Sequence, residues 1–486
     1  MANQEFALNK YTKPTFCSLP TAAQLRESLI AGEGADARDQ IKKLFDNDTF
    51  VEISAYTKRA FSEFLSTDKA NELEGVICGY GAIDGKLVFA FVEDATRMGG
   101  AIDERHAKKI TDLYKMAMDN GAPVIGIFNS NGTDIFEGTA GLAAYGRIMS
   151  AITKASGVIP QIAYVAGNCI GTCAAIASMF DVVVKEDSAS LYVNSPALTG
   201  ENHAQDAIVS YHGDRLQCIG YIVSLVSFMP SNSSVGIQCS EIYTDNLNRK
   251  LGNLDFGGDA LATISVIADN SMFIELGHDY APSATTAFTT IGGVRCGVVA
   301  TSYAKNEGRI DVAAARKIAK FVALCDSFSI PVVTIVDSLG LAINKKNEEL
   351  FAPELAKLGM AYAASTCPKI TIIHGHAIGA SFVLLGSKSL GADLVYATEN
   401  SEIGALSAAS GVAFAWDKYI TEEKTREELI SEWKMSVSSP ANAATSGEID
   451  DIISINEMRA RICSALLMLS AKGNASAISR RKVLPL

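Results

Sequence analysis

The chain has 486 residues, of which 48% are apolar and 20% charged, and its formal net charge at pH 7 is -12. This length is too great for one hydrophobic core, so it predicts two domains of ordinary size in a compact globular protein. The acidic charge without a Lys/Arg cluster argues against a nucleic-acid partner, because phosphate binding depends on clustered basic side chains.

The chain carries no sign of export or membrane insertion. Its opening, "MANQEFALNKYTK", has no apolar run, so we expect no signal peptide and a cytoplasmic protein. The charge-free segment 155–180 is long enough to span a membrane, but Pro160, Gln161, Asn168 and several glycines argue against a membrane helix. Ten cysteines without a CxxC motif predict reduced, mostly buried thiols.

The first half alternates short apolar strands with an amphipathic helix. The runs 86–92 ("KLVFAFV") and 124–128 ("VIGIF") have the length and the β-branched or aromatic content of buried strands. Between them, the apolar residues of 103–121 recur at helical spacing, and this segment ends in Asn-Gly, which predicts a helix end. Strands that alternate with helices predict parallel strands joined by crossovers.

The second half repeats this order. Helical spacing over 311–328 and an apolar run over 330–337 match the first half. The echo extends to 44–54 with 267–277, and to Asp181 with Asp393. The spacing of 208 positions is constant over almost ninety residues, and it joins Pro123 to Pro331, Gly132 to Gly340 and Gly171 to Gly379.

Each half therefore reads as one α/β domain of the same design, and the two are related by internal duplication. A polar stretch, 230–253, separates the halves. We place the boundary inside it and expect an N-terminal domain over 1–245 and a C-terminal domain over 246–486.

The segment "QIAYVAGNCIGTCAAIASMF", 161–180, predicts a strand through Val165, a glycine turn up to Gly171 and a helix from Thr172 to Met179. Such a turn leaves the first helical N–H groups unpaired. Backed by the helix dipole, these amides can hold an oxyanion where negative charge develops. A purely structural role in packing helix on sheet stays open, as does a phosphate cradle, although neither copy has GxGxxG or GKS/T.

The ordered set of motifs resembles the carboxyltransferase (β) subunits of biotin-dependent acyl-CoA carboxylases, of the propionyl-CoA carboxylase type. The similar stretches include "ARDQIKKLFDNDTFVEI", "RMGGAIDERHAKKI", "SGVIPQIAYVAGNCIGTCAA", "FVALCDSFSIPVVTIVD", "IDDIISINEMRARICSAL" and the terminal "RKVLPL". The resemblance runs nearly end to end. It implies two tandem crotonase-like (ClpP/crotonase) domains, the first on the acyl-CoA side and the second on the biotin side.

The resemblance also implies the chemistry and its catalytic positions. A carboxyl group would move between biotin and a CoA thioester, with one backbone oxyanion hole for the thioester enolate and another for the ureido oxygen of biotin. Gly171 and Thr172 match the first hole. Ala380 and Ser381 match the second, whereas the internal alignment selects Gly379 and Ala380, so all three are candidates. No side-chain base is required, because the ureido nitrogen takes the α-proton.

The acyl-CoA side is expected to include further substrate-binding positions: Gly99, Gly100, Lys109, Gly132 and Gly138. Arg97 and Lys108 flank the same glycine pair, and like Lys109 they are candidates for the CoA phosphates or, alternatively, solvated helix charges. Val383 stands where propionyl-type enzymes usually carry Asp, which predicts an altered acceptor pocket for the acyl chain.

Several family motifs are changed in this chain. "SGGAR" followed by "QEG" is here "SNGTDIFEG", 130–138, so an arginine is missing and Asp134 is new. "AGGA" is "IGTC", "YGGAY" is "IGASF", and "PGF" is "LGL". The sequence has no AMKM motif and no ATP-grasp region, so biotin must arrive on another chain.

Other reactive side chains read as structural. His374 and His376 would share one strand face, but no partner ligand stands at a suggestive spacing, so we expect core or site-wall histidines and no metal site. Cys169 and Cys173 lie beside a helix start, where thiol pKa values fall, and a catalytic thiol is the alternative to buried structural cysteines.

Three functional hypotheses follow. The first is a carboxyltransferase subunit in a homo-oligomer, a dimer or hexamer, with a biotin carboxyl carrier protein and a biotin carboxylase subunit as partners. The second is the α subunit of a sodium-pumping acyl-CoA decarboxylase, with a membrane subunit as partner. The third is a non-catalytic structural paralogue in a carboxylase complex. The sequence fixes neither the acyl chain nor the direction of transfer.

Overall fold

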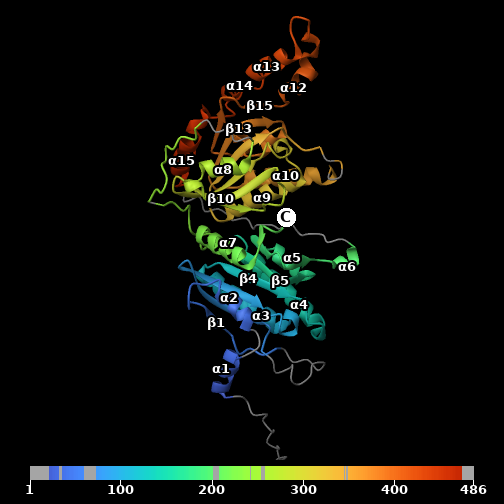
Figure 1. Cartoon of the computed structure of the whole chain (residues 1–486), viewed down its shortest axis with the longest axis vertical. Coiled ribbons are helices and arrows are strands. Elements are labelled where there is room, and N and C mark those ends of the chain that lie inside the picture. The colour runs from blue at the N-terminus through green and yellow to red at the C-terminus, as the bar shows by residue number, and fades with distance from the viewer. Residues whose placement is uncertain are drawn as a thin grey trace, which may run out of the picture.

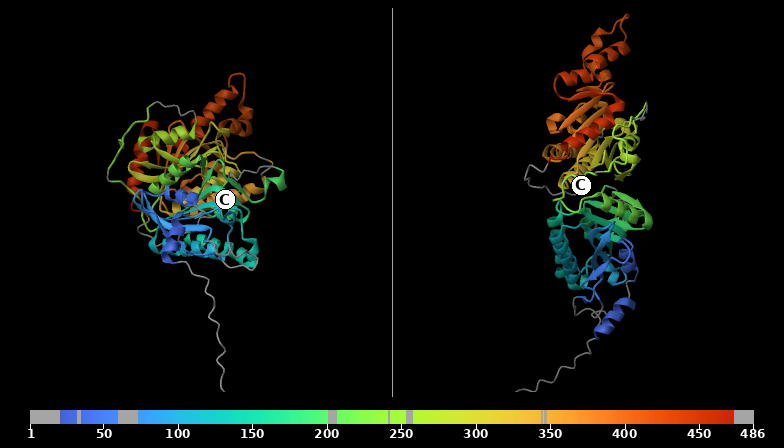
Figure 2. Two further views of the ribbon diagram at one scale, coloured as in Figure 1. Left: turned by 60° about the horizontal axis from the view of Figure 1, so that its bottom comes forward. Right: turned by 90° about the vertical axis from the view of Figure 1, so that its left-hand side faces the viewer.

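The two halves of the chain are stacked along the long axis of the molecule, and they meet near α7 and α9 (Figure 1). The structure is a computed structural model that describes residues 21–31, 35–59, 73–200, 207–240, 242–252, 258–343, 345 and 348–472. The orange-red part of the chain that contains α12 to α14 projects beyond the second sheet (Figures 1 and 2).

The first half is built on one sheet with the strand order β1-β2-β3-β4-β5-β6-β8, and β7 pairs with β5. The central strands β3 to β6 and β8 are parallel, while β1, β2 and β3 pair antiparallel. The strands are β1 Val51–Ile53, β2 Val76–Ile83, β3 Lys86–Glu93, β4 Val124–Ser130, β5 Gln161–Ile170, β6 Val182–Glu186, β7 Ser190–Tyr192 and β8 Tyr211–Gly213.

The second sheet has the same order of equivalent strands. It runs β9-β10-β11-β12-β13-β14-β16, and β15 pairs with β13 as β7 pairs with β5. The predicted internal duplication is therefore confirmed strand by strand. The strands are β9 Phe273–Leu276, β10 Ala284–Ile291, β11 Val294–Thr301, β12 Val332–Ser338, β13 Lys369–Ile378, β14 Leu394–Thr398, β15 Glu402–Gly404 and β16 Asp451–Ile453.

The predicted parallel strands are confirmed by β3 and β4, which α3 connects, but the sheets as a whole are mixed. Each contains a hairpin, β2–β3 and β10–β11, that the sequence reading did not anticipate. Both hairpins close through two residues with positive φ: Asp84 and Gly85 (50° and 70°), and Gly292 and Gly293 (58° and 76°). Such turns match the twist of antiparallel strands, so a short loop suffices where a parallel pair needs a crossover helix.

Helices cover both faces of each sheet. One buried cluster joins α3 and α4 to the first sheet, and another joins α8 and α15 to the second. A third runs from the other face of the first sheet through α7 to α9 and α10, so the two halves share a core. The helices are α1 Ala22–Ala31, α2 Ala35–Lys42, α3 Glu104–Asn120, α4 Thr139–Ala155, α5 Thr172–Ser178, α6 Pro196–Thr199, α7 Arg215–Phe228, α8 Ala260–Ile267, α9 Val312–Ser327, α10 Glu348–Ala364, α11 Ala380–Leu384, α12 Ala408–Gly411, α13 Arg426–Ser436, α14 Pro440–Thr445 and α15 Met458–Leu469.

Local signals place the crossover helix correctly. The Asp103 side chain accepts a hydrogen bond from the His106 N–H at the start of α3, and Gly121 ends this helix in the left-handed conformation. The matched aspartates are also equivalent, because Asp181 and Asp393 accept the first N–H of β5 and of β13 at 2.8 Å.

Contacts pass from the first half to the second within the polar stretch 230–253. The Ser233 N–H donates to Val158 in the first half, whereas the Ser240 N–H donates to Gly293 in the second. The domain limits 1–245 and 246–486 agree with this region and stay a prediction. Over the described ranges, no helix combines the length and apolarity needed to cross a membrane.

Candidate functional site

The first repeated turn joins β5 to α5 through Gly171. β5 continues to Ile170, further than the expected end at Val165, because its last residues pair with β7 after a register shift against β4. Gly171 has φ 61° and ψ -128° and forms the N-cap of α5, so a residue with a Cβ would be strained there. α5 ends at Ser178, one residue before the expected end.

The amides of this turn differ in their availability. The Gly171 N–H already donates to the Tyr192 carbonyl of β7 at 2.9 Å. The next amides belong to Thr172 and Cys173, and no acceptor for either exists among the described residues. Gly171 therefore supplies the backbone conformation, and the Thr172 amide is the better candidate donor.

The second turn has the same geometry. Gly379, between β13 and α11, has φ 59° and ψ -131°, and its N–H donates to the Gly404 carbonyl of β15 at 2.8 Å. Ala380 and Ser381 follow, and within the described part of the chain their N–H groups meet no acceptor. The Ser381 hydroxyl is buried and donates to Ile378, so it supports the turn from inside. Val383 is 47% exposed on α11.

The ends of three neighbouring strands meet at the first turn. The Gly99 carbonyl, after β3, accepts the Asn131 N–H at 2.9 Å. The Asn131 side chain in turn accepts a hydrogen bond at 2.7 Å from the side chain of Asn168, which lies three residues before Gly171. The structure thus brings Gly99 and the turn of Gly171 to one edge of the sheet, where parallel strands present their carboxyl ends.

The other predicted glycines line the same edge. Gly100 has φ 70° and is buried against the Asn129 carbonyl. Gly132 has φ 120°, and its carbonyl accepts the Ile102 N–H at 2.9 Å. Gly138, with φ 56° and ψ -123°, caps α4 with nearly the same geometry as Gly171.

A buried polar network lies beneath the first turn. Glu93 accepts the Asn129 N–H at 2.9 Å, and Asn129 in turn accepts the Asn168 N–H. The imidazole of His106 lies 3.4 Å from Glu74 and 3.9 Å from Glu93, and all three side chains are buried. Burial raises the pKa of Glu93 to about 7. The network therefore holds the strand ends rigidly from below.

Asp134, which replaces the family arginine, pairs with a distant cation. Its carboxylate lies 2.6 Å from the Arg59 guanidinium, and both side chains are buried. Asp103 lies 3.8 Å from the same guanidinium. Burial and the charge of Glu74 raise the pKa of Asp103 to about 6. Position 134 thus belongs to a buried ion pair with Arg59, which the sequence reading did not single out.

The carboxyl ends of the second sheet carry a different polar pair. His376 lies on β13 three residues before Gly379, and its Nδ1 is 2.8 Å from Oδ1 of Asp337 on β12. The His376 ring stacks on Tyr303 with ring centroids 4.9 Å apart. No group of three or more His, Cys, Asp or Glu side chains in the described ranges is arranged to hold a metal ion.

The structure does not support Lys109 as a phosphate ligand. Its ammonium group is buried and donates to the Val76 carbonyl of β2. Arg97 is also buried, 3.3 Å from Asp94, whereas Lys108 is exposed and pairs with Asp112. Helical spacing did not reveal that Lys109 faces the sheet.

The two turn cysteines lack the features of nucleophiles. Cys169 and Cys173 are buried, and burial raises the pKa of Cys169 and brings that of Cys173 to about 12. The Cys173 thiol lies 3.8 Å from the Tyr145 hydroxyl. Cys173 therefore packs between α4 and α5, and both cysteines belong to the buried core of the first half.

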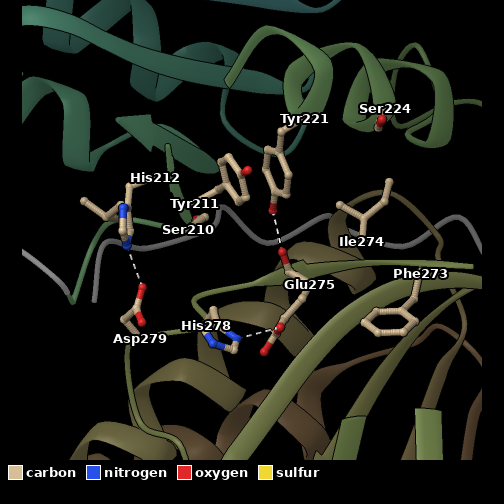
Figure 3. A pocket seen from close by; sticks show the side chains of 11 residues that line it. Ser210, Tyr211, His212, Tyr221, Ser224, Phe273, Ile274, Glu275, His278 and Asp279 are labelled. Carbon is tan, nitrogen blue, oxygen red and sulfur yellow. Dashed lines mark hydrogen bonds and ion pairs between the residues drawn. The ribbon is translucent and has the colours of Figure 1, made fainter. Parts of the chain in front are cut away.

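A pocket of about 810 Å³ lies between the two halves (Figure 3). Tyr211 and Tyr221 stack at 4.2 Å on one side, and the His212 ring lies 2.7 Å from both Asp187 and Asp279. None of the predicted site residues is among the described residues that line it. The pocket is thus distinct from the two turns.

Sequence reasoning considered His376 as a core or site-wall residue but missed Asn129, Asn168 and Asp337 beside the turns. The spacing of 208 positions contains a signal for them, since it pairs Asn129 with Asp337 and Asn168 with His376. These four residues occupy equivalent places in the two sheets, but their chemistry differs.

Comparison with known proteins gives a consistent result. A family model described as "Carboxyl transferase domain" matches residues 34–484. The chain is 32% identical over 477 residues to the methylmalonyl-CoA decarboxylase subunit alpha of Veillonella parvula, with 93% of each chain covered. It is 30% identical over 492 residues to the propionyl-CoA carboxylase beta chain of Saccharopolyspora erythraea, covering 93% of this chain and 90% of that one.

Solved structures include a similar fold. The crystal structure of transcarboxylase 12S, described as a hexamer assembly with hydrolysed methylmalonyl-coenzyme A bound, matches with a TM-score of 0.87 at 28% identity. The match covers 96% of this chain and 98% of that chain. Together with the duplicated sheets, it confirms the expectation of two crotonase-like α/β domains.

Proposed function

The chain belongs to the carboxyl transferase family, and from this premise we propose that it moves a carboxyl group between biotin on a carrier protein and the α-carbon of an acyl-CoA. The observation that carries the proposal is the pair of equivalent glycine turns. Each turn uses the glycine N–H inside the fold and leaves the next amide, of Thr172 or Ala380, without an acceptor among the described residues.

The first turn suits the thioester. When a bond at the α-carbon breaks, negative charge develops on the thioester oxygen, and a fixed N–H donor stabilises that charge. Such a donor contributes on the order of 3 kcal/mol to transition-state stabilisation. The Thr172 amide would supply it, with Gly171 fixing the turn. The same stabilisation serves carboxylation and decarboxylation, so the geometry of the first turn does not indicate the direction of carboxyl transfer.

The second turn suits a ureido oxygen. This turn would hold biotin, which supplies the carrier for the carboxyl group in the reaction. The amides of Ala380 and Ser381 fit a neutral oxygen acceptor, because each is a donor without a described partner. Gly99, Gly100, Gly132 and Gly138 stay the proposed wall of the acyl-CoA side, and Val383 the proposed contact for the acyl chain.

We propose that the protein works as a homo-oligomer, a dimer or hexamer, in the cytoplasm and with separate biotin-bearing partners. Leu198 on α6 is 84% exposed, and Phe414 beside the projecting α12 is 85% exposed. Large apolar side chains on projecting segments are typical of protein interfaces. The likeness to the 12S hexamer supports this assembly.

Carboxyl exchange tests the proposed function. Purified protein is mixed with free biotin and carboxyl-labelled malonyl-, methylmalonyl- or glutaconyl-CoA. Transfer of label to biotin from one of these thioesters is the expected result, and it names the acyl chain. If no label is transferred and calorimetry detects no CoA binding, the proposal of an enzyme is wrong. The hypothesis of a non-catalytic structural paralogue then stands.

The direction of transfer needs a separate measurement. Relatives of the chain include both a decarboxylase subunit and a carboxylase chain. Copurification with a membrane subunit would favour the decarboxylase, and copurification with a biotin carboxylase subunit would favour the carboxylase.

A further inference from the structure

The second turn has a polar neighbourhood of its own at one edge of the second sheet. β11, β12 and β13 are parallel neighbours, so their carboxyl ends meet there. Tyr303 follows β11, Asp337 lies near the end of β12, and His376 lies on β13 shortly before Gly379. Three side chains from three neighbouring strand ends thus meet on β13, three residues before the turn at Gly379.

One carboxylate oxygen of Asp337 contacts both the backbone and the imidazole of His376. This oxygen, Oδ1, accepts the His376 backbone N–H at 2.9 Å and lies 2.8 Å from the ring Nδ1. A carboxylate can only accept, so in the neutral imidazole Nδ1 carries the proton and Nε2 carries a lone pair. The register of β12 against β13 shifts between Val336 and Ser338, which places Asp337 at an irregularity of the strand.

The backbone of β13 is adapted to this carboxylate. At Gly375 an added Cβ would lie 2.4 Å from Oδ1 of Asp337, so only glycine leaves room for it. The ring of His376 lies nearly parallel to that of Tyr303, with 18° between the planes. The side chain is 28% exposed, and the described residues offer Nε2 no partner. The imidazole is therefore fixed on one side and open on the other.

The first half provides an internal comparison. Asn129 and Asn168 occupy the places of Asp337 and His376, and they make the same side-chain to backbone hydrogen bond. The Asn168 side chain is tied to Asn131 at 2.7 Å, whereas His376 has its outward nitrogen open. The fold therefore needs the backbone hydrogen bond but not an imidazole, and the second half has acquired a lone pair facing outward.

We propose that Nε2 of His376 accepts a hydrogen bond from a ring N–H of the ureido group bound at the second turn. This inference rests on the proposed function. A urea offers one carbonyl acceptor and N–H donors beside it. The amides of Ala380 and Ser381 complement the carbonyl, and Nε2 complements the N–H that does not carry the carboxyl group. His376 would then be a specificity residue for biotin, and Asp337 a positioning residue that fixes its tautomer.

Binding to the full-length protein tests the inference in two variants. His376→Phe keeps the stacking on Tyr303 but removes both ring nitrogens. Asp337→Ala keeps the imidazole but removes the oxygen that accepts from Nδ1, so the proton is no longer held on Nδ1 and the lone pair is no longer held on Nε2. We expect each to weaken the binding of free biotin, measured by NMR titration, about 10-fold, as for one lost hydrogen bond.

Matched controls separate recognition from damage to the fold. Both variants should keep the wild-type affinity for the acyl-CoA identified by exchange, because that ligand belongs to the first turn. Nitrogen-15 NMR of the wild-type imidazole should show the proton on Nδ1. The small urea 2-imidazolidinone should bind better than its N,N′-dimethyl derivative, and this preference should vanish in His376→Phe.

The outcomes discriminate between the two proposals. If the wild type exchanges carboxyl groups but His376→Phe binds biotin normally, the role of His376 is wrong and the proposed function stands. A proton on Nε2 in the wild type would also overturn it. If the wild type neither exchanges carboxyl groups nor binds biotin, the proposed function fails and the inference fails with it.

Discussion

Asn168 and His376 lie at equivalent positions on β5 and β13, and each donates its backbone N–H to a side-chain oxygen of the neighbouring strand. The acceptors are Asn129 at 3.2 Å and Asp337 at 2.9 Å. The two halves thus share the hydrogen bond that holds the strand ends and differ in the side chains beside the two turns. The thioester and the ureido group proposed for the two turns would therefore meet different side chains.

Replacing Gly171 by alanine should disable the first turn. The glycine has φ 61°, and an added Cβ meets nothing within 4 Å, so the change tests backbone conformation alone. We expect a loss of about 1–3 kcal/mol in the free energy of unfolding and about a 100-fold fall in carboxyl exchange. Gly146→Ala is the control, since this helical glycine also has open space and should be stabilised. Equal exchange rates in the two variants would contradict the assignment.

Removing Arg59 should destabilise the first half strongly. Arg59→Met leaves the buried carboxylate of Asp134 without its partner at 2.6 Å, which typically costs about 3–5 kcal/mol. Urea unfolding followed by circular dichroism measures the loss. The double variant Arg59→Met with Asp134→Leu should recover part of the stability. The control is Lys108→Ala, which breaks the exposed ion pair with Asp112 and should change the free energy of unfolding by less than about 0.5 kcal/mol.

The contact between the halves should depend on pH through His212. Hydrogen bonds to Asp187 and Asp279 raise the pKa of His212. A raised pKa means that this stabilisation is complete below the unfolded value of about 6.5 and is lost as pH rises through the folded value. We expect the melting temperature of His212→Gln to fall furthest below the wild type near pH 6, and the gap to close at high pH and high salt.

The control for this prediction is His278→Gln, in the same pocket. His278 pairs with Glu275 of its own half at 2.9 Å, so its loss does not break the contact between the halves. A difference in melting temperature between His212→Gln and the wild type that stayed constant from pH 6 to pH 9 would show that a protonated His212 does not stabilise the contact between the halves.

The turn cysteines should resist alkylation in the native protein. Iodoacetamide near neutral pH should label the exposed Cys239 and spare Cys169 and Cys173, because burial raises their thiol pKa values. Mass spectrometry locates the modified sites, and carboxyl exchange should persist. Labelling in urea is the control, since it exposes every thiol. Rapid loss of exchange with modification of Cys173 would point to a catalytic thiol.

The sequence by itself determined the duplication, the main strands and helices and the position of both turns. These features depend on signals within a few residues, such as the alternation of apolar residues, the Asp103 cap and the glycine at the end of α3. The constant spacing of 208 positions then placed Gly379 once Gly171 was recognised. Local signals and the repeat therefore sufficed for two α/β domains of the same design, whereas the crotonase-like fold and the roles of the two turns were expectations from the family resemblance.

Only the tertiary structure decided which groups at the site are available. β7 returns to take the Gly171 N–H, Arg59 reaches Asp134, and Lys109 turns toward the sheet. Each of these contacts joins residues separated by some twenty to eighty positions. Their partners are chosen by how the strands and helices pack, because a hydrogen bond or an ion pair depends on distance in space and leaves no local pattern in the chain.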